Sequence, residues 1–266
     1  MICAGVDIGS INTKVVFYDS ERRMMVHHCV EPTGFKPRVA GENTFRHCLK
    51  ATSFSEKEIG PIVATGYGRH TVRFARESIT EISALARGVH YFFPDVRTVF
   101  DIGGQDSKVV ALDAFGKVRS FAMNDRCAAG TGHFLQTIAN ALKIKIEDFG
   151  RLALESGSPI LISSLCVVMA ESEVLSLVAE DRPVPDIIAG IHYALARRVV
   201  NLAAGTGIIE PVAFTGGVAR NQGMCAALED TLGMKVQIPD DPIIVSALSA
   251  ALTATSLPPT ASGGSP

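Results

Sequence analysis

Residues 7–19 read DIGSINTKVVFYD, and residues 101–113 read DIGGQDSKVVALD. Seven of the thirteen positions are identical, and two more exchange one small polar residue for another. Each copy contains Asp-Ile-Gly, a short polar turn, a lysine and a mostly apolar run. This pattern predicts a β-hairpin whose tip carries small and polar residues. Because the segment occurs twice, we expect two lobes related by duplication.

The tips of these hairpins have the chemistry of a phosphate site. Glycine lets backbone N–H groups approach an anion, and a row of such groups cradles phosphate. An aspartate at a strand end, here Asp7 or Asp101, can hold Mg²⁺ through water. We therefore expect the two hairpins to grip a polyphosphate from both sides. Two ordinary hairpins are the alternative, but strand packing requires none of the repeated Asp, Gly and Lys. The chain has neither GxxxxGK[ST] nor a strand-linked GxGxxG.

Composition excludes several classes of protein. A length of 266 residues suggests one large domain or two lobes around a cleft. The net charge of −2 is scattered, which argues against a nucleic-acid partner. The longest apolar stretch, 159–179, is interrupted by serine and glutamate and is too polar to span a bilayer. The first strand follows Met1 directly, so we expect no signal segment, no membrane partner and a cytoplasmic protein.

The hydrophobic pattern predicts an α/β protein in which hairpins open each half and helices follow. Strands are expected at 2–8, 13–19, 24–30, 61–65, 97–102, 107–112, 117–122, 160–163, 211–215 and 234–238. Helices are expected at 42–50, 70–91, 131–142, 147–155, 168–179, 184–205, 220–232 and 243–255. We expect a first lobe over 1–94, completed by helix 243–255, and a second lobe over 95–242. The Pro/Gly/Ser-rich tail 256–266 is expected to be disordered.

A glycine pair marks a further candidate binding segment. Residues 211–222, PVAFTGGVARNQ, read as a buried strand, two glycines and a helix start. Gly216 and Gly217 would let the backbone lie flat against a planar ligand. A plain strand-to-helix turn is the alternative, but two upstream phosphate hairpins favour an adenosine site.

Two of the six cysteines share a local pattern. Cys127 lies in MNDRCAAGTGHFL, with Thr131 as a possible helix cap, and Cys166 lies in ISSLCVVMAESEV. Each is predicted to follow a strand and precede a helix, whose free N–H groups and dipole stabilise a thiolate. A [4Fe–4S] cluster needs about four thiolates, so two per chain suffice only if two chains contribute. Two buried core thiols remain the alternative. A disulfide framework is not expected in a chain of this kind.

Taken together, these motifs resemble a known family. DIGSINTK, ATGYGR, DIGGQDSK, MNDRCAAGTG, ISSLC…AESEV, IIAGIH, TGGVARN and SALSAAL are similar to the activator ATPases of 2-hydroxyacyl-CoA dehydratases. They equally resemble the related ATP-binding subunits of benzoyl-CoA reductase. The resemblance covers residues 3 to 255 and implies two ribonuclease-H-like lobes of the actin/Hsp70 type around a nucleotide cleft.

The resemblance implies an ATPase that pushes a low-potential electron to a CoA-thioester dehydratase or aryl-CoA reductase. It implies a homodimer, or a pair with a paralogous subunit, sharing one [4Fe–4S] cluster held by Cys127 and Cys166. Ferredoxin or flavodoxin is the expected electron donor. Asp7, Asp101 and Gln105 would be catalytic, positioning Mg²⁺ and the attacking water. The residues expected to bind ATP or ADP are Gly9, Ser10, Asn12, Thr13, Lys14, Gly103, Gly104, Gly130, Gly132, Gly216, Gly217 and Asn221.

Three departures from the family pattern stand out. His133 replaces an arginine after CAAGTG, which alters the surroundings of the cluster or a partner contact. Val167-Val168-Met169 replaces a stretch with a threonine and an aromatic residue, and a more apolar surround changes solvent access to the cluster. Ser246 and Ser249 replace glycines of the last helix and predict slightly looser packing there, with an altered nucleotide fit.

Competing functions remain open at this point. A sugar or acetate kinase could use the same hairpins, but it would carry a substrate-binding insertion and would have no use for the two cysteines. A redox-inactive switch similar to Hsp70 or actin is a second alternative. Within the family, the dehydratase activator and the aryl-CoA reductase component are both possible, and the stretch ARGVHYFFPDVRT, 86–98, leans weakly towards the reductase.

Overall fold

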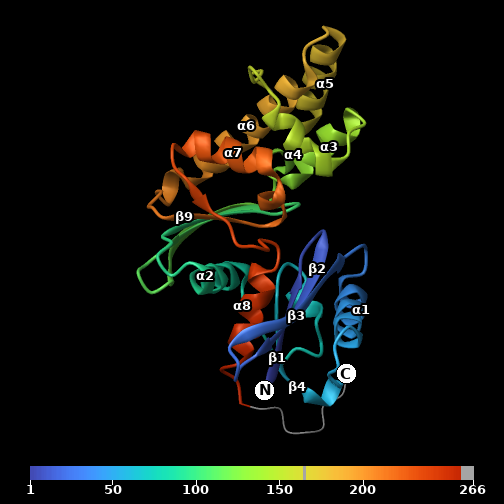
Figure 1. The fold of residues 1–266 in the computed structure, drawn as a ribbon, viewed down its shortest axis with the longest axis vertical. Helices are drawn as coiled ribbons and strands as arrows, with labels where there is room; N and C mark the ends of the chain where they lie inside the picture. Colours follow the sequence, from blue (N-terminus) through green and yellow to red (C-terminus); the bar gives the residue numbers. More distant parts are fainter. Residues whose placement is uncertain (164–165, 259–266) are drawn as a thin grey trace. The chain divides into compact units, whose positions relative to one another are not determined.

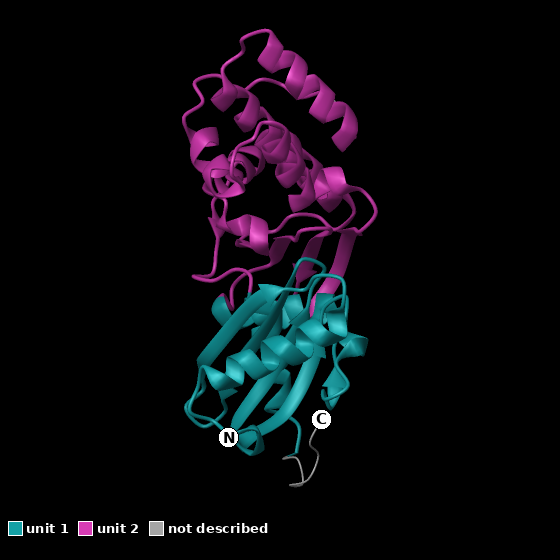
Figure 2. Ribbon diagram, turned by 90° about the vertical axis from the view of Figure 1, so that its right-hand side faces the viewer, with its two compact units in different colours: residues 1–92, 244–266 teal, residues 93–243 magenta. Residues whose placement is uncertain are grey.

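The computed structural model describes residues 1–163 and 166–258, and Figure 1 shows its ribbon. The chain forms two compact units, coloured separately in Figure 2. Unit 1 comprises Met1–Phe92 and Ile244–Pro266, and unit 2 comprises Phe93–Ile243. Most of the tail predicted to be disordered, 259–266, lies outside the described residues.

Unit 1 is a five-stranded sheet with helices on both faces. Its elements are β1 (Ile2–Ile8), β2 (Asn12–Asp19), β3 (Met24–Pro32), α1 (Pro37–Lys50), β4 (Ile59–Thr65), β5 (Glu77–Ser78), α2 (Glu81–Phe92) and α8 (Val245–Ala254). The strand order is β3-β2-β1-β4-β5. Strands β1, β2 and β3 are antiparallel, whereas β4 runs parallel to β1.

The centre of this sheet is covered on both sides. Every residue of β1 is buried, as expected for a strand with α1 on one face and α8 on the other (Figure 1). Helix α8 approaches closely because its buried face is rich in alanine and Gly5 of β1 has no side chain. A Cβ at Gly5 would overlap the backbone of Ala247 and Ala251, so only glycine fits this contact.

Ser249 lies in the same tight contact layer of α8. It is wholly buried. Its Oγ has no hydrogen-bond partner among the described residues, and a buried hydroxyl without a partner costs free energy.

We expect Ser249→Ala to raise the free energy of unfolding by about 1–2 kcal/mol, measured by urea denaturation. Ser246→Ala, at a half-buried position of the same helix, should gain no more than about 0.5 kcal/mol. A loss of stability in Ser249→Ala would show that its hydroxyl is satisfied.

Unit 2 repeats the sheet and adds a larger group of helices. Its elements are β6 (Thr98–Ile102), β7 (Ser107–Leu112), β8 (Val118–Asn124), α3 (Gly132–Ala141), α4 (Ile146–Leu154), α5 (Val167–Ala179), α6 (Val184–Leu202), β9 (Val212–Thr215), α7 (Gln222–Leu232) and β10 (Val236–Gln237). The strand order is β10-β9-β6-β7-β8, the order of unit 1 read from the other edge. The predicted α/β fold with duplicated lobes is confirmed.

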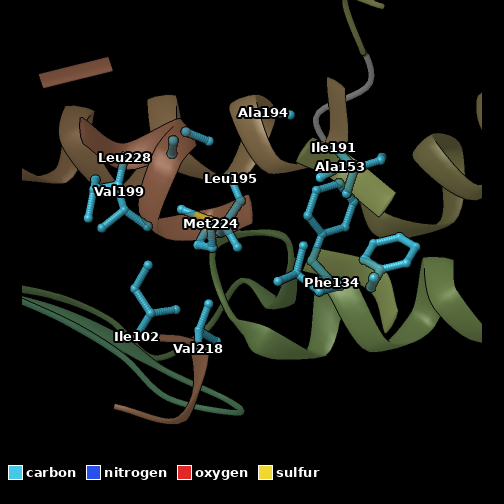
Figure 3. Close-up of a cluster of buried hydrophobic side chains, with 14 of the residues drawn as sticks. Ile102, Phe134, Ala153, Ile191, Ala194, Leu195, Val199, Val218, Met224 and Leu228 are labelled. Atoms are coloured by element: carbon cyan, nitrogen blue, oxygen red, sulfur yellow. The ribbon is translucent and has the colours of Figure 1, made fainter. Parts of the chain in front are cut away.

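Helix α6 runs through the core of unit 2. Its sequence is apolar around most of its circumference, which is typical of a helix enclosed by others. Ile191, Leu195 and Val199 of α6 meet Phe134 of α3 and Met224 of α7 in one buried cluster (Figure 3). Within the described part of the chain, no helix combines the length and hydropathy needed to cross a membrane.

Two sequence predictions about single elements are wrong. Residues 160–163 form no strand, because their backbone bonds elsewhere: the Ile160 N–H donates to the carbonyl of Asp186 at 3.0 Å. The predicted helix 70–91 begins only at Glu81, since residues 69–71 form a 3₁₀ turn and Glu77–Ser78 adds β5 to the sheet edge. Helix α1 begins earlier than predicted, with Pro37 in its first turn, where proline is favoured.

Candidate functional site

The repeated aspartate and lysine are direct cross-strand partners in both sheets. Asp7 lies opposite Lys14 in the β1–β2 ladder, and Asp101 lies opposite Lys108 in the β6–β7 ladder. Lys14 Nζ is 2.9 Å from Asp7 Oδ2. Lys108 Nζ is 3.7 Å from Asp101 Oδ2 and 2.6 Å from Asp106 Oδ2. Each lysine therefore offsets the charge of the carboxylate at its own strand end, which explains why both recur.

A threonine on the neighbouring parallel strand lies beside each Asp–Lys pair. Thr65 of β4 is the register partner of Asp7, and Thr215 of β9 is the register partner of Asp101. Thr215 Oγ1 donates to Asp101 Oδ1 at 2.8 Å. The same three residue types thus meet at corresponding places in the two units. Neither threonine was among the predicted site residues, although a Thr-Gly pair at 65–66 and 215–216 is a second repeated signal.

The glycines after these threonines are required by the backbone. Gly66 has a φ of +89° and Gly216 a φ of +86°, a left-handed region that side chains rarely adopt. A Cβ at Gly66 would overlap the carboxylate of Asp7, and one at Gly216 would overlap the backbone of Ile102. In each unit the chain therefore passes within contact distance of the aspartate-bearing strand end.

At the first hairpin tip, polar groups hold the loop in place. The Gly9 N–H donates to the carbonyl of Asn12 at 3.1 Å. Thr33 Oγ1 donates to the carbonyl of Gly9 at 2.8 Å and lies 2.9 Å from Thr13 Oγ1. Thr13 is wholly buried, so its hydroxyl supports the tip from within. Ser10 is half-buried and lies on the loop itself.

At the second tip, the hairpin is joined to the start of α3. The backbone N–H of Gly132 donates to the carbonyl of Gly103, and that of His133 to the carbonyl of Gly104, both at 2.9 Å. The predicted residues Gly103, Gly104 and Gly132 are therefore brought together. Gln105 is exposed at this tip, and no described contact occupies its side chain.

Cys127 lies in a loop between β8 and α3, and the side chain of Asn124 holds this loop through two hydrogen bonds. Asn124 Nδ2 donates to the carbonyl of Cys127 at 2.8 Å, and the Cys127 N–H donates to Asn124 Oδ1 at 3.1 Å. A 3₁₀ turn, Ala128–Gly130, intervenes before α3, which Thr131 caps as predicted. Ser107 Oγ in turn donates to the carbonyl of Gly130. Asn124 was not found from the sequence, although it stands three residues before the cysteine.

Cys166 is the N-cap residue of α5. Glu173, two turns into the helix, accepts hydrogen bonds at 3.0 Å from both the backbone N–H and Oγ of Ser163. These hydrogen bonds tie Ser163 to helix α5. Val168 and Met169, in the departure from the family pattern, are exposed on the first turn. Cys166 thus stands at a helix start beside an exposed apolar patch.

Exposure separates these two cysteines from the other four. Cys127 and Cys166 are exposed, whereas Cys3 and Cys48 are buried and Cys29 and Cys225 are half-buried. Burial raises the pKa of Cys225 to about 11, so its thiol stays protonated at neutral pH. Cys127 and Cys166 are therefore the two thiols most accessible from solvent.

A cavity of about 420 Å³ lies beside Cys127 within unit 2. Its lining includes Ser107, Asn124 and Arg198. The Arg198 guanidinium lies over the ring of Phe134, 5.6 Å from its centroid. The cavity thus places one cationic side chain, Arg198, near the exposed Cys127.

The last predicted nucleotide residues lie after β9. Gly217 begins a short 3₁₀ turn, and Asn221 is the N-cap of α7. Asn221 Oδ1 accepts from the Met224 N–H at 2.9 Å and lies 3.1 Å from His192 Nε2. Burial lowers the pKa of His192, which keeps its imidazole neutral. The side-chain oxygen of Asn221 is thus engaged within unit 2, by the helix cap and the buried histidine.

Comparison with known proteins agrees with these features. The chain is 38% identical to the 2-hydroxyisocaproyl-CoA dehydratase activator of Clostridioides difficile, covering 96% of this chain and 95% of that protein. The crystal structure of (R)-2-hydroxyglutaryl-CoA dehydratase component A of Acidaminococcus fermentans superposes with a TM-score of 0.92 at 37% identity, covering 96% and 98% of the two chains.

A more distant relative is a benzoyl-CoA reductase subunit of Thauera aromatica, 29% identical over 87% of this chain and 83% of that protein. The predicted resemblance and the actin/Hsp70 type of fold are confirmed. Residues 4–254 match the sequence model of a protein family described as the BadF/BadG/BcrA/BcrD ATPase family. The chain therefore belongs to the BadF/BadG/BcrA/BcrD ATPase family.

Proposed function

We propose that this protein hydrolyses Mg-ATP and uses that reaction to deliver a low-potential electron to a CoA-thioester dehydratase. The nucleotide and redox parts are each supported by a set of residues described above. The choice of a dehydratase over an aryl-CoA reductase rests on identities of 38% to a dehydratase activator and 29% to a reductase subunit. Residues 86–98 resemble the reductase subunits more, but this is one short segment, whereas the identities are measured along nearly the whole chain.

The nucleotide assignment rests on the duplicated Asp-Lys-Thr-Gly sets. Carboxylates at strand ends suit water-mediated Mg²⁺ binding, and the glycine tips offer backbone N–H groups to phosphate. In this proposal Asp7 and Asp101 position Mg²⁺, and Gln105 orients the attacking water. The phosphates and the adenosine are bound by residues of the hairpin tips, the lysines and the segments around α3 and β9: Gly9, Ser10, Asn12, Thr13, Lys14, Gly103, Gly104, Gly130, Gly132, Gly216, Gly217 and Asn221.

The redox assignment rests on Cys127 and Cys166. Both are exposed, each precedes a helical turn, and Cys127 lines a cavity that also contains Arg198. Such thiols fit the donor set of a [4Fe–4S] cluster, which would supply one-electron transfer at low potential. Because four thiolates are needed, two copies of this chain, or one copy and a paralogous subunit, would each contribute two.

The observation that carries the coupling is the hydrogen-bonded path from the second hairpin to the Cys127 loop. The carbonyls of Gly103 and Gly104 accept from the first two N–H groups of α3. Ser107, at the start of the returning strand, bonds to Gly130 beside the loop that Asn124 fixes. Helix α5, which Cys166 caps, packs against α3. A shift of the hairpin on phosphate binding therefore reaches the supports of both cysteines.

The remaining partners follow from this role. An activator that donates an electron must be recharged, and we propose ferredoxin or flavodoxin as the donor. A low-potential, thiolate-bound cofactor also fits a reducing compartment, so we place the protein in the cytoplasm. The acceptor is the catalytic component that acts on the CoA thioester, and no acyl-CoA site is assigned to this chain.

Nucleotide-dependent exposure of the cluster tests the coupling. Protein prepared without oxygen should lose iron to a chelator faster with Mg-ATP than with Mg-ADP, followed by absorbance of the iron–chelator complex. The cause is the displacement of the cysteine supports by the phosphate hairpin. Ser107→Ala removes the hydroxyl that bonds Gly130, so it should bring the two rates closer together. Equal rates in the unmodified protein would contradict the coupling.

An anaerobic iron count separates this function from its alternatives. A sugar kinase, an acetate kinase or a redox-inactive switch would hydrolyse or bind ATP without iron. The proposed protein should contain iron as isolated and show the broad visible absorbance of an iron–sulfur cluster. Iron-free protein with full ATPase activity would favour the alternatives.

A further inference from the structure

A group of metal-binding side chains lies in unit 1 and shares no residue with the phosphate hairpins or the exposed cysteines. His27 and Cys29 are on β3, and Cys48 is on α1. One ligand atom from each lies within 4.8 Å of the other two. Within the described part of the chain, no other trio of His, Cys, Asp or Glu meets this criterion.

The sheet and helix place these side chains together by simple periodicity. Residues 27, 29 and 31 alternate along β3, so all three point to the face that α1 covers. Cys48 reaches this face from α1, with its thiol 3.8 Å from the carbonyl of Val15 on β2. At the next position along β3, Glu31 accepts a hydrogen bond at 3.0 Å from Thr44 of α1 and is paired with His47. Helix α1 is therefore held over this face at two successive positions.

The separation of the ligand atoms suits a tetrahedral ion. Zinc lies about 2.3 Å from a cysteine sulfur and about 2.05 Å from a histidine nitrogen, so at the tetrahedral angle these two atoms are about 3.6 Å apart. Cys29 Sγ is 3.6 Å from His27 Nε2. Two zinc-bound sulfurs are about 3.8 Å apart by the same geometry, within the 4.8 Å limit that the trio satisfies.

The three side chains differ in their exposure to solvent. Cys48 is buried, whereas His27 and Cys29 are half-buried and leave an approach from solvent. A divalent cation with two thiolates has no net charge, which makes the complex compatible with this partly buried place.

We propose that His27, Cys29 and Cys48 form a zinc site, with water as the fourth ligand. Binding forms one Zn–N and two Zn–S bonds, and the two thiols release their protons to solvent. Nitrogen and sulfur donors in this number select Zn²⁺ over the hard cations Mg²⁺ and Ca²⁺. The site would tie α1 to β3, which is an edge strand of its sheet. Since edge strands are prone to pair with other chains, anchoring this one to a helix limits unwanted strand pairing at the sheet edge.

Cobalt substitution provides the test. Co²⁺ replaces zinc in tetrahedral sites and shows thiolate charge-transfer and d–d absorbance. The full chain carrying Cys127→Ser and Cys166→Ser, reduced and metal-free, should bind one Co²⁺ per chain with this spectrum, and Zn²⁺ should displace it. Because the double variant lacks the two proposed cluster thiols, any cobalt–thiolate absorbance it shows comes from other cysteines. Cys225→Ser added to this background should leave the spectrum intact, since that thiol lies in unit 2 and donates to the carbonyl of Ala219.

His27→Gln and Cys48→Ser in the same background should remove the spectrum or weaken Co²⁺ binding. The loss should be at least the roughly 10- to 100-fold that follows removal of a residue merely supporting a metal ligand. His27 is half-buried, so His27→Gln should fold, and its metal-free melting temperature should match that of the background. Zn²⁺ should raise the melting temperature of the background protein and not that of His27→Gln. A cobalt spectrum unaffected by Cys48→Ser, no binding at all, or a Cys29–Cys48 disulfide in anaerobically purified protein would overturn the assignment.

Discussion

Asp101→Asn is expected to lower the rate of Mg-ATP hydrolysis about 100-fold or more, the size of effect seen when one group that stabilises transition-state charge is lost. The neutral amide cannot orient the Mg²⁺-bound waters as a carboxylate does. Steady-state phosphate release at saturating Mg-ATP measures the effect. Because the position lies at a strand end and is only half-buried, the change removes little core packing.

The contacts of Asp101 make this substitution a clean one. An asparagine at this position keeps an oxygen for the 2.8 Å hydrogen bond from Thr215. Lys108 also keeps a carboxylate partner, since its Nζ is 2.6 Å from Asp106. Asp7→Asn is less informative, because Lys14 would lose its 2.9 Å partner in a largely buried place and the fold would be destabilised as well.

Asp113→Asn is the matched control. It lies at the far end of the same hairpin, where its carboxylate accepts backbone N–H groups of Phe115 and Lys117. These hydrogen bonds hold the pKa of Asp113 below its usual value, and an asparagine oxygen can replace the acceptor. Its ATPase rate should stay within about twofold of the unmodified protein, because surface changes of this kind rarely exceed about 0.5 kcal/mol. Hydrolysis by Asp101→Asn at that same rate would refute the phosphate-site assignment.

The duplication made the fold predictable from sequence. Asp7 with Lys14 and Asp101 with Lys108 occur at the same spacing, and a hairpin converts that spacing into direct cross-strand pairing. Helices with strong periodicity, such as α3 and α4, lie within about one residue of their predicted ends. The recurrence of a whole unit therefore carried more information than the propensity of any one residue.

Tertiary contacts decided the segments that sequence reasoning missed. The apolar run 160–163 looks like a strand, yet its neighbour is the backbone of α6 at Gly190, where only a glycine allows Ile160 to approach. Residues 77–78 join a sheet edge through β4, a long-range pairing that no local pattern encodes. In both places the partner lies far away in the chain, so local periodicity cannot identify it.

The same distinction applies to the candidate sites. Residues of the hairpins were accessible to sequence reasoning because their pattern is local and repeated. Thr65 and Thr215 join the aspartates only through parallel strand pairing, and the trio of His27, Cys29 and Cys48 assembles only when α1 packs on β3. These side chains can be recognised as sites only once the strand order and the packing of the helices are known.

Cys127→Ser and Cys166→Ser are each expected to abolish the proposed cluster. Protein prepared without oxygen should be brown, with about four irons per two chains, the content of one [4Fe–4S] cluster with four thiolate ligands. Either substitution removes two of those four ligands from a symmetric dimer, because each chain supplies the same residue twice. Iron analysis and visible absorbance measure the loss, and air should bleach the unmodified protein.

The controls use the two half-buried cysteines, Cys225 and Cys29. Cys225→Ser should keep the full iron content, since the half-buried thiol donates at 3.3 Å to the carbonyl of Ala219 and a serine hydroxyl can do the same. Cys29→Ser should also keep it, because Cys29 lies in unit 1 and Cys127 and Cys166 lie in unit 2. Loss of iron without loss of ATP hydrolysis in Cys166→Ser would separate the two chemistries. A full cluster that survives Cys166→Ser, or a colourless unmodified protein, would leave the ATPase assignment standing and remove the basis for electron transfer.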